Sequence, residues 1–251
     1  MARADETFDA IVVGGVDFGE ADRVVHLITT QGRVAAFGHG ARKSKRRFAG
    51  ALDPFTTIAA TISHSKKRQG TLPTLTAAVV ERSRLPLRRS LESIALGSYF
   101  TELVWRVTPE GDTSDSMFSL LTAALDALEV EDASLASRRA FELFVLDELG
   151  YTPQLDRCVA CGDVTDRPHV DFERGGVLCP AHAEGAPLTG PKTIQWTEGV
   201  FRASSFEPLG GYDAEWAHRA AVRLGAPMSR FFATLLDYPL KATRMLEDLE
   251  L

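Results

Sequence analysis

The sequence has few of the features that mark secreted, membrane-spanning or disulfide-linked proteins. It contains only three cysteines in 251 residues, too few for a disulfide framework. No apolar run approaches the roughly 18 residues that a membrane-spanning helix requires. The first residues, Met-Ala-Arg-Ala-Asp-Glu, lack the basic-then-apolar order of a secretory signal. We therefore expect a cytoplasmic protein that has no membrane partner.

Signatures of the common enzyme classes are missing as well. The sequence has no GxxxxGKS/T phosphate loop, no GxGxxG motif opening a helix after a strand, and no GxSxG nucleophile elbow. Three carboxylates near the N-terminus, Asp17, Glu20 and Asp22, are not paired into an acid–base dyad, and we expect them to be solvated. The sequence thus predicts a protein that is not an enzyme.

Positive charge is concentrated in the first third of the chain. Residues 1–90 contain 15 Lys and Arg against 8 Asp and Glu, whereas residues 91–251 contain 13 against 26. Such a difference between two parts of a chain favours a polyanion-binding N-terminal module on an acidic body. A solvated basic surface without a partner is the alternative.

Short runs rich in β-branched residues, bounded by turn residues, occupy the N-terminal part of the chain. They predict strands at 8–16, 23–29, 33–37, 55–63 and 75–80. Five short strands in about 75 residues favour a small barrel, and the OB-fold is one of the few architectures that fit. The alternation alone does not separate an OB-fold from an SH3-like barrel.

Apolar residues recur at helical spacing after about residue 84. Helices are predicted around 91–103, 114–128 and 138–149, and again around 212–224, 228–236 and 240–249. Residues 151–190 are rich in Gly, Pro and Asp and have no helical period. The chain is therefore predicted to be an α+β multi-domain protein: a barrel domain (1–82), an all-α domain (83–150 and 191–251) and an inserted module (151–190).

The predicted insertion contains every cysteine of the chain. Cys158 and Cys161 form a C-x2-C pair, and Cys179 and His182 form a C-x2-H pair after seventeen intervening residues. Each pair presents two ligands on one tight turn, and two such turns complete the tetrahedral shell of a structural zinc, which leaves no open position for a substrate. His169 is an alternative fourth ligand, and three unrelated thiols are the alternative without metal.

Cationic residues cluster in two predicted turns of the barrel. Five of the six residues from 42 to 47 are Lys or Arg, and a smaller cluster follows at 66–68. Cations in barrel loops form a groove that can follow a phosphate backbone, whereas a nuclear-localisation tract is the usual alternative for such a run. The predicted DNA-binding residues are Arg33, Arg42, Lys43, Lys45, Arg46, Arg47, Lys66, Lys67 and Arg68.

Three phenylalanines flank the larger basic cluster. Phe37, Phe48 and Phe55 could stack on bases, but we expect at least two of them to be buried in the core. Without a clear aromatic platform, we expect weak sequence preference.

Several stretches resemble the RecO family of recombination mediators. Residues 38–55 resemble its basic loop and following strand, residues 138–153 the helix before its zinc module, and residues 240–244 its C-terminal helix. Residues 158–162 and 175–179 match its ligand turns. The order of barrel, helices, zinc insertion and helices is also that of the family. His182 is a departure, because many members have a cysteine at that place.

This resemblance implies an N-terminal OB-fold that binds single- and double-stranded DNA and anneals complementary strands. It also implies a nucleoid-associated protein in the cytoplasm. The implied partners are RecR and the single-stranded DNA-binding protein, whose coated strands are handed to the RecA recombinase.

The resemblance further implies that the single-stranded DNA-binding protein docks through an acidic, apolar-ended tail. Such a tail needs a guanidinium for its carboxylate and an apolar notch for its last aromatic residue. Arg138 and Arg139 precede Phe141 and Phe144 on one predicted helix and are the proposed docking residues. The alternative is that both arginines pair with carboxylates of their own helix, such as Glu142 or Asp147.

Two other functions are compatible with the same features. An RNA-binding or ribosome-associated OB protein would use the same basic loop. A zinc module that regulates a small GTPase would need a catalytic arginine beside the metal, for which Arg157 and Arg174 are available.

Overall fold

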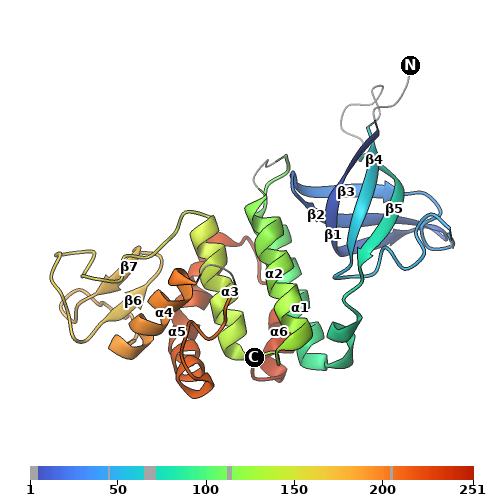
Figure 1. Ribbon diagram of the computed structural model, residues 1–251. Coiled ribbons are helices and arrows are strands. Elements are labelled where there is room, and N and C mark those ends of the chain that lie inside the picture. Colours follow the sequence, from blue (N-terminus) through green and yellow to red (C-terminus); the bar gives the residue numbers. More distant parts are fainter. Residues whose placement is uncertain (1–4, 45, 65–71, 112–114, 204–205) are drawn as a thin grey trace. The chain divides into compact units, whose positions relative to one another are not determined.

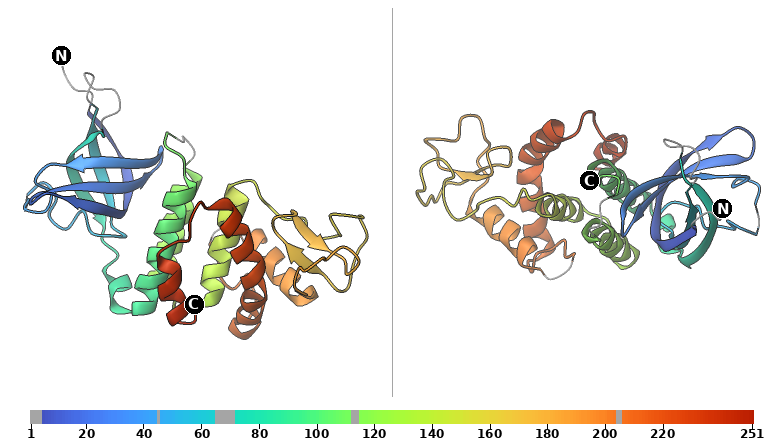
Figure 2. Two further views of the ribbon diagram at one scale, coloured as in Figure 1. Left: turned by 180° about the vertical axis from the view of Figure 1, so that it is seen from behind. Right: turned by 90° about the horizontal axis from the view of Figure 1, so that it is seen from above.

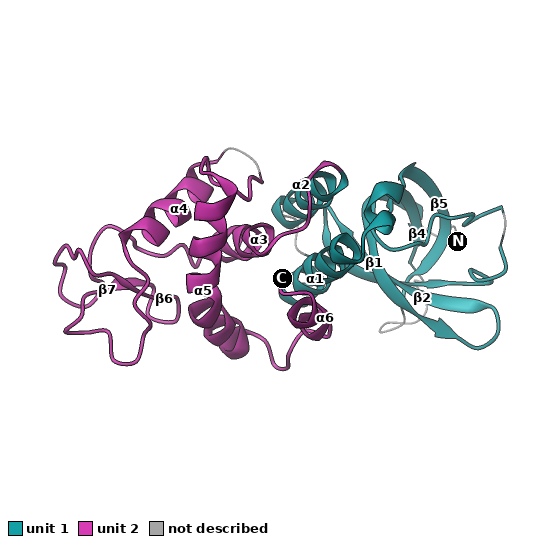
Figure 3. Ribbon diagram, turned by 90° about the horizontal axis from the view of Figure 1, so that it is seen from below, with its two compact units in different colours: residues 1–129 teal, residues 130–251 magenta. Residues whose placement is uncertain are grey.

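The computed structural model describes residues 5–44, 46–64, 72–111, 115–203 and 206–251 (Figure 1, Figure 2). Lys45 and the cluster Lys66, Lys67 and Arg68 lie outside these ranges. The chain divides into two compact units, Met1–Glu129 and Val130–Leu251 (Figure 3).

The described part of the first unit opens with five strands that close into a barrel in the order β1-β2-β3-β5-β4. All neighbouring strands are antiparallel except β3 and β5, which pair in parallel at Phe37 and Thr74. Closure leaves no long unpaired edge. The strands are β1 (Asp5–Phe18), β2 (Asp22–Thr29), β3 (Gly32–Gly38), β4 (Thr57–Ser63) and β5 (Thr74–Arg82).

The long first strand closes the barrel because it pairs on both sides. Its first half pairs with β4 and its second half with β2, and the register with β2 shifts between Val12 and Gly14. A shift of this kind bends the strand. Gly15 allows β1 to lie close to β2 after this bend, because a Cβ at this position would be only 2.5 Å from the carbonyl oxygen of Val24 in β2.

Inward-facing residues of all five strands form the barrel core. Its fully buried members include Val12, Leu27, Ala36, Ile58 and Leu75. The loop after β3 adds to the same core with three further apolar residues, Phe48, Ala51 and Leu52. The basic loop is therefore anchored to the barrel by its second half.

The remainder of the first unit is helical. It comprises the 3₁₀ helix η1 (Leu85–Arg89), α1 (Leu91–Val107) and α2 (Ser116–Val130). Ser90 caps α1, because its Oγ accepts a hydrogen bond from the backbone N–H of Ser93 at 3.2 Å. Gly97 of α1 makes room for the ring of Phe55, which a Cβ would approach to 3.3 Å. The prediction of β-strands followed by helices is confirmed.

A buried arginine connects the end of β5 with α2. Arg84 is only 2% exposed. Its Nε donates to Asp126 Oδ1 at 2.7 Å, and its Nη1 donates to the carbonyl oxygen of Phe55 and to Thr57 Oγ1. Arg82 also pairs with Asp126, at 2.9 Å. Asp126 therefore compensates a cation that has no access to water.

Asp126→Asn is expected to lower the free energy of unfolding by on the order of 2 kcal/mol. The change leaves the buried guanidinium of Arg84 without its carboxylate, although partial exposure of Asp126 reduces the loss. Urea denaturation measures it. Asp53→Asn is the control, because its pair with Arg88 is exposed and should contribute less than about 1 kcal/mol. Equal losses in the two variants would contradict this role of Asp126.

The second unit contains a short hairpin among helices. Its described elements are α3 (Leu135–Glu148), β6 (His169–Asp171), β7 (Gly176–Leu178), α4 (Pro191–Arg202), α5 (Ala214–Leu235) and α6 (Ala242–Asp248). Helix α3 packs against α4 and α5, and β6 also contacts α5. Figure 2 shows the loops around β6 and β7 as a lobe next to α4 and α5.

The prediction of separate helices at 212–224 and 228–236 was wrong. A single helix, α5, continues through Pro227. Proline removes one backbone hydrogen bond, but Leu224, Met228 and Phe231 continue one buried face across it. Burial of this apolar face outweighs the missing hydrogen bond. Helix α4, which starts at Pro191, was not predicted as a separate element.

In the part of the chain that the structure describes, no helix combines the length and the apolar character needed to cross a bilayer.

Candidate metal centre and nucleic-acid interface

Four side chains of the second unit converge on one point between two tight turns. The ligand atoms of Cys158, Cys161, Cys179 and His182 all lie within 4.8 Å of one another. The Sγ atoms of Cys161 and Cys179 are 3.9 Å apart, and Nδ1 of His182 lies 3.8 Å from Cys158 Sγ and 3.2 Å from Cys179 Sγ. Two zinc–sulfur bonds of about 2.3 Å at a tetrahedral angle separate the sulfurs by about 3.8 Å. The four residues therefore form a group that could hold a metal ion.

Backbone hydrogen bonds of the local turns bring these side chains together. The N–H of Gly162 donates to the carbonyl oxygen of Cys158 at 2.8 Å, and the N–H of His182 donates to that of Cys179 at 2.9 Å. Gly162 has a φ of 81°, which favours glycine. The N–H of Val159 donates to the carbonyl oxygen of Val177 at 2.8 Å and so ties the first turn to β7. The short hairpin thus connects two turns that are distant in sequence.

The buried thiol of Cys158 is prepared for the thiolate form. Burial raises its pKa, but the backbone N–H groups of Cys179, Ala160 and Cys161 and the side chain of Cys161 outweigh this effect and lower the pKa to about 6. The pKa of Cys161 is lowered by a backbone hydrogen bond at Asp163, but burial and hydrogen bonds to neighbouring side chains, that of Cys158 among them, raise it to about 11. The thiolate is the form of cysteine that binds metal ions. The local backbone therefore favours metal binding at this sulfur.

The nearby alternatives from the sequence have other contacts. His169 lies outside the four-residue group, and its Nδ1 is 2.8 Å from the carbonyl oxygen of Ala186. Arg157 pairs with Asp156 on the surface. Arg174 donates to the carbonyl oxygen of His182 at 2.8 Å, so it braces the second turn.

The basic loop after β3 lies on the surface of the barrel, and its described cations Arg42, Lys43, Arg46 and Arg47 are all exposed. Two of them face carboxylates at the end of β1 and in the turn that follows it. Arg42 Nε lies 3.2 Å from Asp17, and Lys43 Nζ lies 3.8 Å from Glu20. Both carboxylates are exposed to solvent, as expected, and in addition they offset part of the positive charge of the loop. The sequence gives no signal for this pairing, since it depends on how two turns meet.

Arg46 and Arg47 differ from the other two cations. Neither has a carboxylate partner within the ranges that the structure describes. Arg47 donates from Nη2 to the carbonyl oxygen of His39 at 2.6 Å, and its guanidinium lies 5.1 Å from the ring centre of Phe48. These two arginines therefore provide the least compensated positive charge of the described loop.

Arg33 does not belong to this cluster. It lies near the start of β3, whereas the basic loop follows the end of that strand. Its guanidinium lies 5.6 Å from the ring centre of Trp105, and its Nη1 donates to the carbonyl oxygen of that residue at 3.2 Å. The structure thus places Arg33 in a contact with α1.

An aromatic cluster lies at the same end of the barrel as the basic loop. Phe18 is 62% exposed, and its ring centre lies 5.6 Å from that of Phe37, which is 4.6 Å from that of His39. Phe48 and Phe55 are buried, which confirms that at least two of the three phenylalanines singled out belong to the core. Phe18 was missed, because a terminal strand position gives no indication of exposure.

Arg138 and Arg139 of α3 are nearly buried. Arg138 Nε donates to Glu142 Oε1 at 3.0 Å, and Arg139 Nη1 donates to Glu142 Oε2 at 2.5 Å. Arg138 also donates to the carbonyl oxygen of Leu251. This is the within-helix pairing stated as the alternative. Docking of an acidic tail on these arginines remains a prediction that requires Glu142, only 1% exposed, to be displaced.

The chain is thus an α+β protein: a small β-barrel is followed by helices, and a Cys/His group lies between those helices along the chain. Two family models match in the same order, Recombination protein O N terminal over residues 1–84 and Recombination protein O C terminal over residues 88–191. The chain belongs to the RecO family of DNA repair proteins.

Three relatives named DNA repair protein RecO illustrate the similarity. The protein of Anaeromyxobacter dehalogenans strain 2CP-C is 36% identical over 250 residues, which cover 95% of this chain and 94% of the relative. That of strain 2CP-1 is 39% identical over 220 residues, 83% and 85% of the two chains. That of Geobacter sulfurreducens is 37% identical over 215 residues, 80% and 86%.

Proposed function

We propose that this chain is a non-catalytic recombination mediator that binds single- and double-stranded DNA and anneals complementary strands. The observation that carries this proposal is that Arg47, which has no carboxylate partner among the described residues, donates to the carbonyl oxygen of His39, whose ring continues the cluster of Phe37 and the exposed Phe18 at one end of the barrel. The strand order β1-β2-β3-β5-β4 supports an OB-fold for this unit.

The physical basis of binding is phosphate neutralisation combined with stacking. Guanidinium groups replace condensed counterions along the strand, and aromatic rings accept any base on their faces. Such contacts do not occupy the Watson–Crick edges of the bases. A strand held in this way can still pair with its complement, which is what annealing requires.

We propose that the Cys158, Cys161, Cys179 and His182 group binds one structural zinc. The ion would hold the two turns together and would take no part in a reaction, because four protein ligands leave no open position. The donor set and its spacing support this proposal. We accordingly propose a barrel domain (1–82), a helical domain (83–150 and 191–251) and a zinc module (151–190).

The proposed partners are RecR and the single-stranded DNA-binding protein, with transfer of coated strands to RecA as the outcome. The proposed site of action is the cytoplasm, at the nucleoid. Family membership supports this assignment.

The direct test is strand annealing on single strands coated with single-stranded DNA-binding protein. The purified chain should accelerate annealing, and it should bind single-stranded and duplex DNA at fixed salt at least as tightly as structured RNA. Clear preference for structured RNA together with no annealing would favour the RNA-binding alternative and overturn the proposal.

Phe18→Ala should weaken binding of a single-stranded oligonucleotide by about 1–3 kcal/mol, the cost of losing one stacked base. The dependence on salt should stay the same, because no charge is removed. Fluorescence anisotropy over a salt series measures both quantities. Val79→Ala, at another exposed apolar position of the barrel, is the control. Equal behaviour of the two variants would exclude stacking on Phe18.

A further inference from the structure

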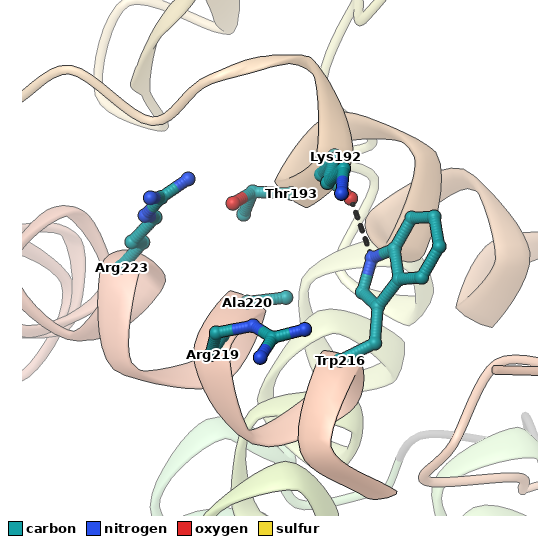
Figure 4. Close-up of a pocket in the computed structure, with 6 residues that line it drawn as sticks. All are labelled: Lys192, Thr193, Trp216, Arg219, Ala220 and Arg223. Atoms are coloured by element: carbon teal, nitrogen blue, oxygen red, sulfur yellow. Dashed lines mark hydrogen bonds between the residues drawn. The ribbon is translucent and has the colours of Figure 1, made fainter. Parts of the chain in front are cut away.

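A hollow between α4 and α5 of the second unit concentrates positive charge. Its volume is about 370 Å³, and its lining residues are Lys192, Thr193, Trp216, Arg219, Ala220 and Arg223 (Figure 4). Three of these six side chains are cationic, although residues 130–251 contain only 12 Lys and Arg against 19 Asp and Glu. A local cationic site on an acidic unit directs anions to that place. We call these three cations and Trp216 the basic hollow.

Most of this charge is uncompensated. Among the described residues, only Arg219 of the three has a carboxylate partner, the exposed Glu215 of its own helix. Arg223 donates from Nη1 to the carbonyl oxygen of Thr189 at 3.2 Å. Lys192 Nζ lies 5.3 Å from the ring centre of Trp216, whose Nε1 donates to the carbonyl oxygen of Lys192 (Figure 4). The indole thus positions Lys192 without neutralising it.

The start of α4 adds to the positive potential. Lys192 and Thr193 belong to its first turn, and no side chain caps that end of the helix. The N–H groups of Thr193 and Ile194 donate to the carbonyl oxygen of Gly190, so the contribution of this helix end is that of its dipole, which favours an anion near the first turn. The hollow therefore combines three cationic side chains with the positive end of a helix dipole.

The lining indicates which anion fits. The apolar walls are only Trp216 and Ala220, and the indole is already in contact with Tyr212, whose ring centre lies 4.6 Å away. An acidic peptide tail that ends in an apolar residue needs an apolar notch, which these walls do not offer. A phosphate group, in contrast, is bound through its charged oxygens, so the cations of the hollow are sufficient to hold it and no apolar contact is needed.

We propose that the basic hollow binds backbone phosphates of single-stranded nucleic acid, as a second contact in addition to the barrel. This inference rests on the proposed function and extends it to the helical unit. Two contacts on one chain raise the effective concentration of the strand at each of them. A long strand should therefore bind more tightly than either contact alone accounts for.

The test is the double variant Lys192→Ala/Arg223→Ala in the full chain, which changes the net charge by as much as one reversal to Glu, with a long oligothymidylate as the probe. Each lost phosphate contact should flatten the slope of log affinity against log salt by about 0.7, so the double variant should flatten it by about 1.4. Arg202→Glu, an exposed residue of α4 that pairs with Glu198, is the matched control. Since Lys192 and Arg223 are exposed, unchanged thermal melting should confirm that the variant is folded.

Two results would overturn the proposal. One is an affinity and slope of the double variant equal to those of Arg202→Glu. The other is loss of binding to an acidic, apolar-ended peptide while oligothymidylate binding stays intact, which would assign the hollow to a protein partner. The variant Arg46→Glu/Arg47→Glu separates this proposal from the barrel interface. If it binds normally while the hollow variant is weakened, the barrel assignment fails and the hollow assignment stands.

Discussion

Cys158→Ser is expected to reduce zinc from about one ion per chain to a small fraction of that in protein dialysed against metal-free buffer. A serine hydroxyl is a poor substitute for a thiolate, and Cys158 is the buried member of the four-residue group. The ion would link the two ligand turns directly. Without it, these turns depend on the short β6–β7 hairpin and its backbone hydrogen bonds. Hydrogen exchange should therefore increase first in residues 151–190, while the barrel stays protected.

Two variants serve as controls for this prediction. His182→Cys should retain the ion, since a fourth thiolate is an equally good ligand for zinc. His169→Gln should also retain it, because His169 lies outside the group. Elemental analysis of the purified proteins measures all three. Full zinc retention in Cys158→Ser would disprove the assignment, and loss in His169→Gln would reassign the fourth ligand.

Reversal of the whole basic loop should weaken binding to every DNA sequence alike. The change converts Arg42, Lys43, Lys45, Arg46 and Arg47 to Glu. Each phosphate contact on a single strand contributes about 0.7 to the slope of log affinity against log salt, so this slope should flatten by up to about 3.5. Anisotropy titrations at several salt concentrations measure it. An unchanged affinity and slope would place the DNA-binding surface elsewhere on the chain.

The structure also predicts how the effect is divided within the loop. Arg46→Glu/Arg47→Glu should weaken binding more than Arg42→Glu/Lys43→Glu, because Asp17 and Glu20 already neutralise the second pair. Both double variants change the net charge equally, so each is the control for the other. An equal loss in the two variants would mean that Asp17 and Glu20 move away when DNA binds.

The fold class and the metal-binding group could be predicted from local patterns. Alternating β-branched runs bounded by turn residues mark strands wherever they occur, and all five predicted strands overlap those of the barrel. The C-x2-C and C-x2-H pairs also needed no tertiary information, because a tight turn places residues three positions apart on one side. The family resemblance rests on the same local features and is confirmed.

Several properties of the predicted sites depended on side chains that are distant in sequence. Arg33 carries the same charge as the loop cations, yet it lies against Trp105 on α1. The spacing of Arg138 and Arg139 before Phe141 and Phe144 predicts a docking site, but in the structure both arginines pair with the buried Glu142. The charge and spacing of side chains can be read from the sequence, whereas their burial and their ion pairs depend on which helices and strands pack against each other.

By itself, the sequence determined that strands precede helices, the ligand spacing of the metal group and the segregation of charge, because each is set by neighbouring residues. Only the tertiary structure decided that Asp17 and Glu20 compensate half of the described basic loop and that Phe18 is exposed beside it. It also decided that Lys192 and Arg223 share a hollow. The reason is physical: the effect of a charge or a ring depends on its solvation and its neighbours, and packing of distant segments sets both.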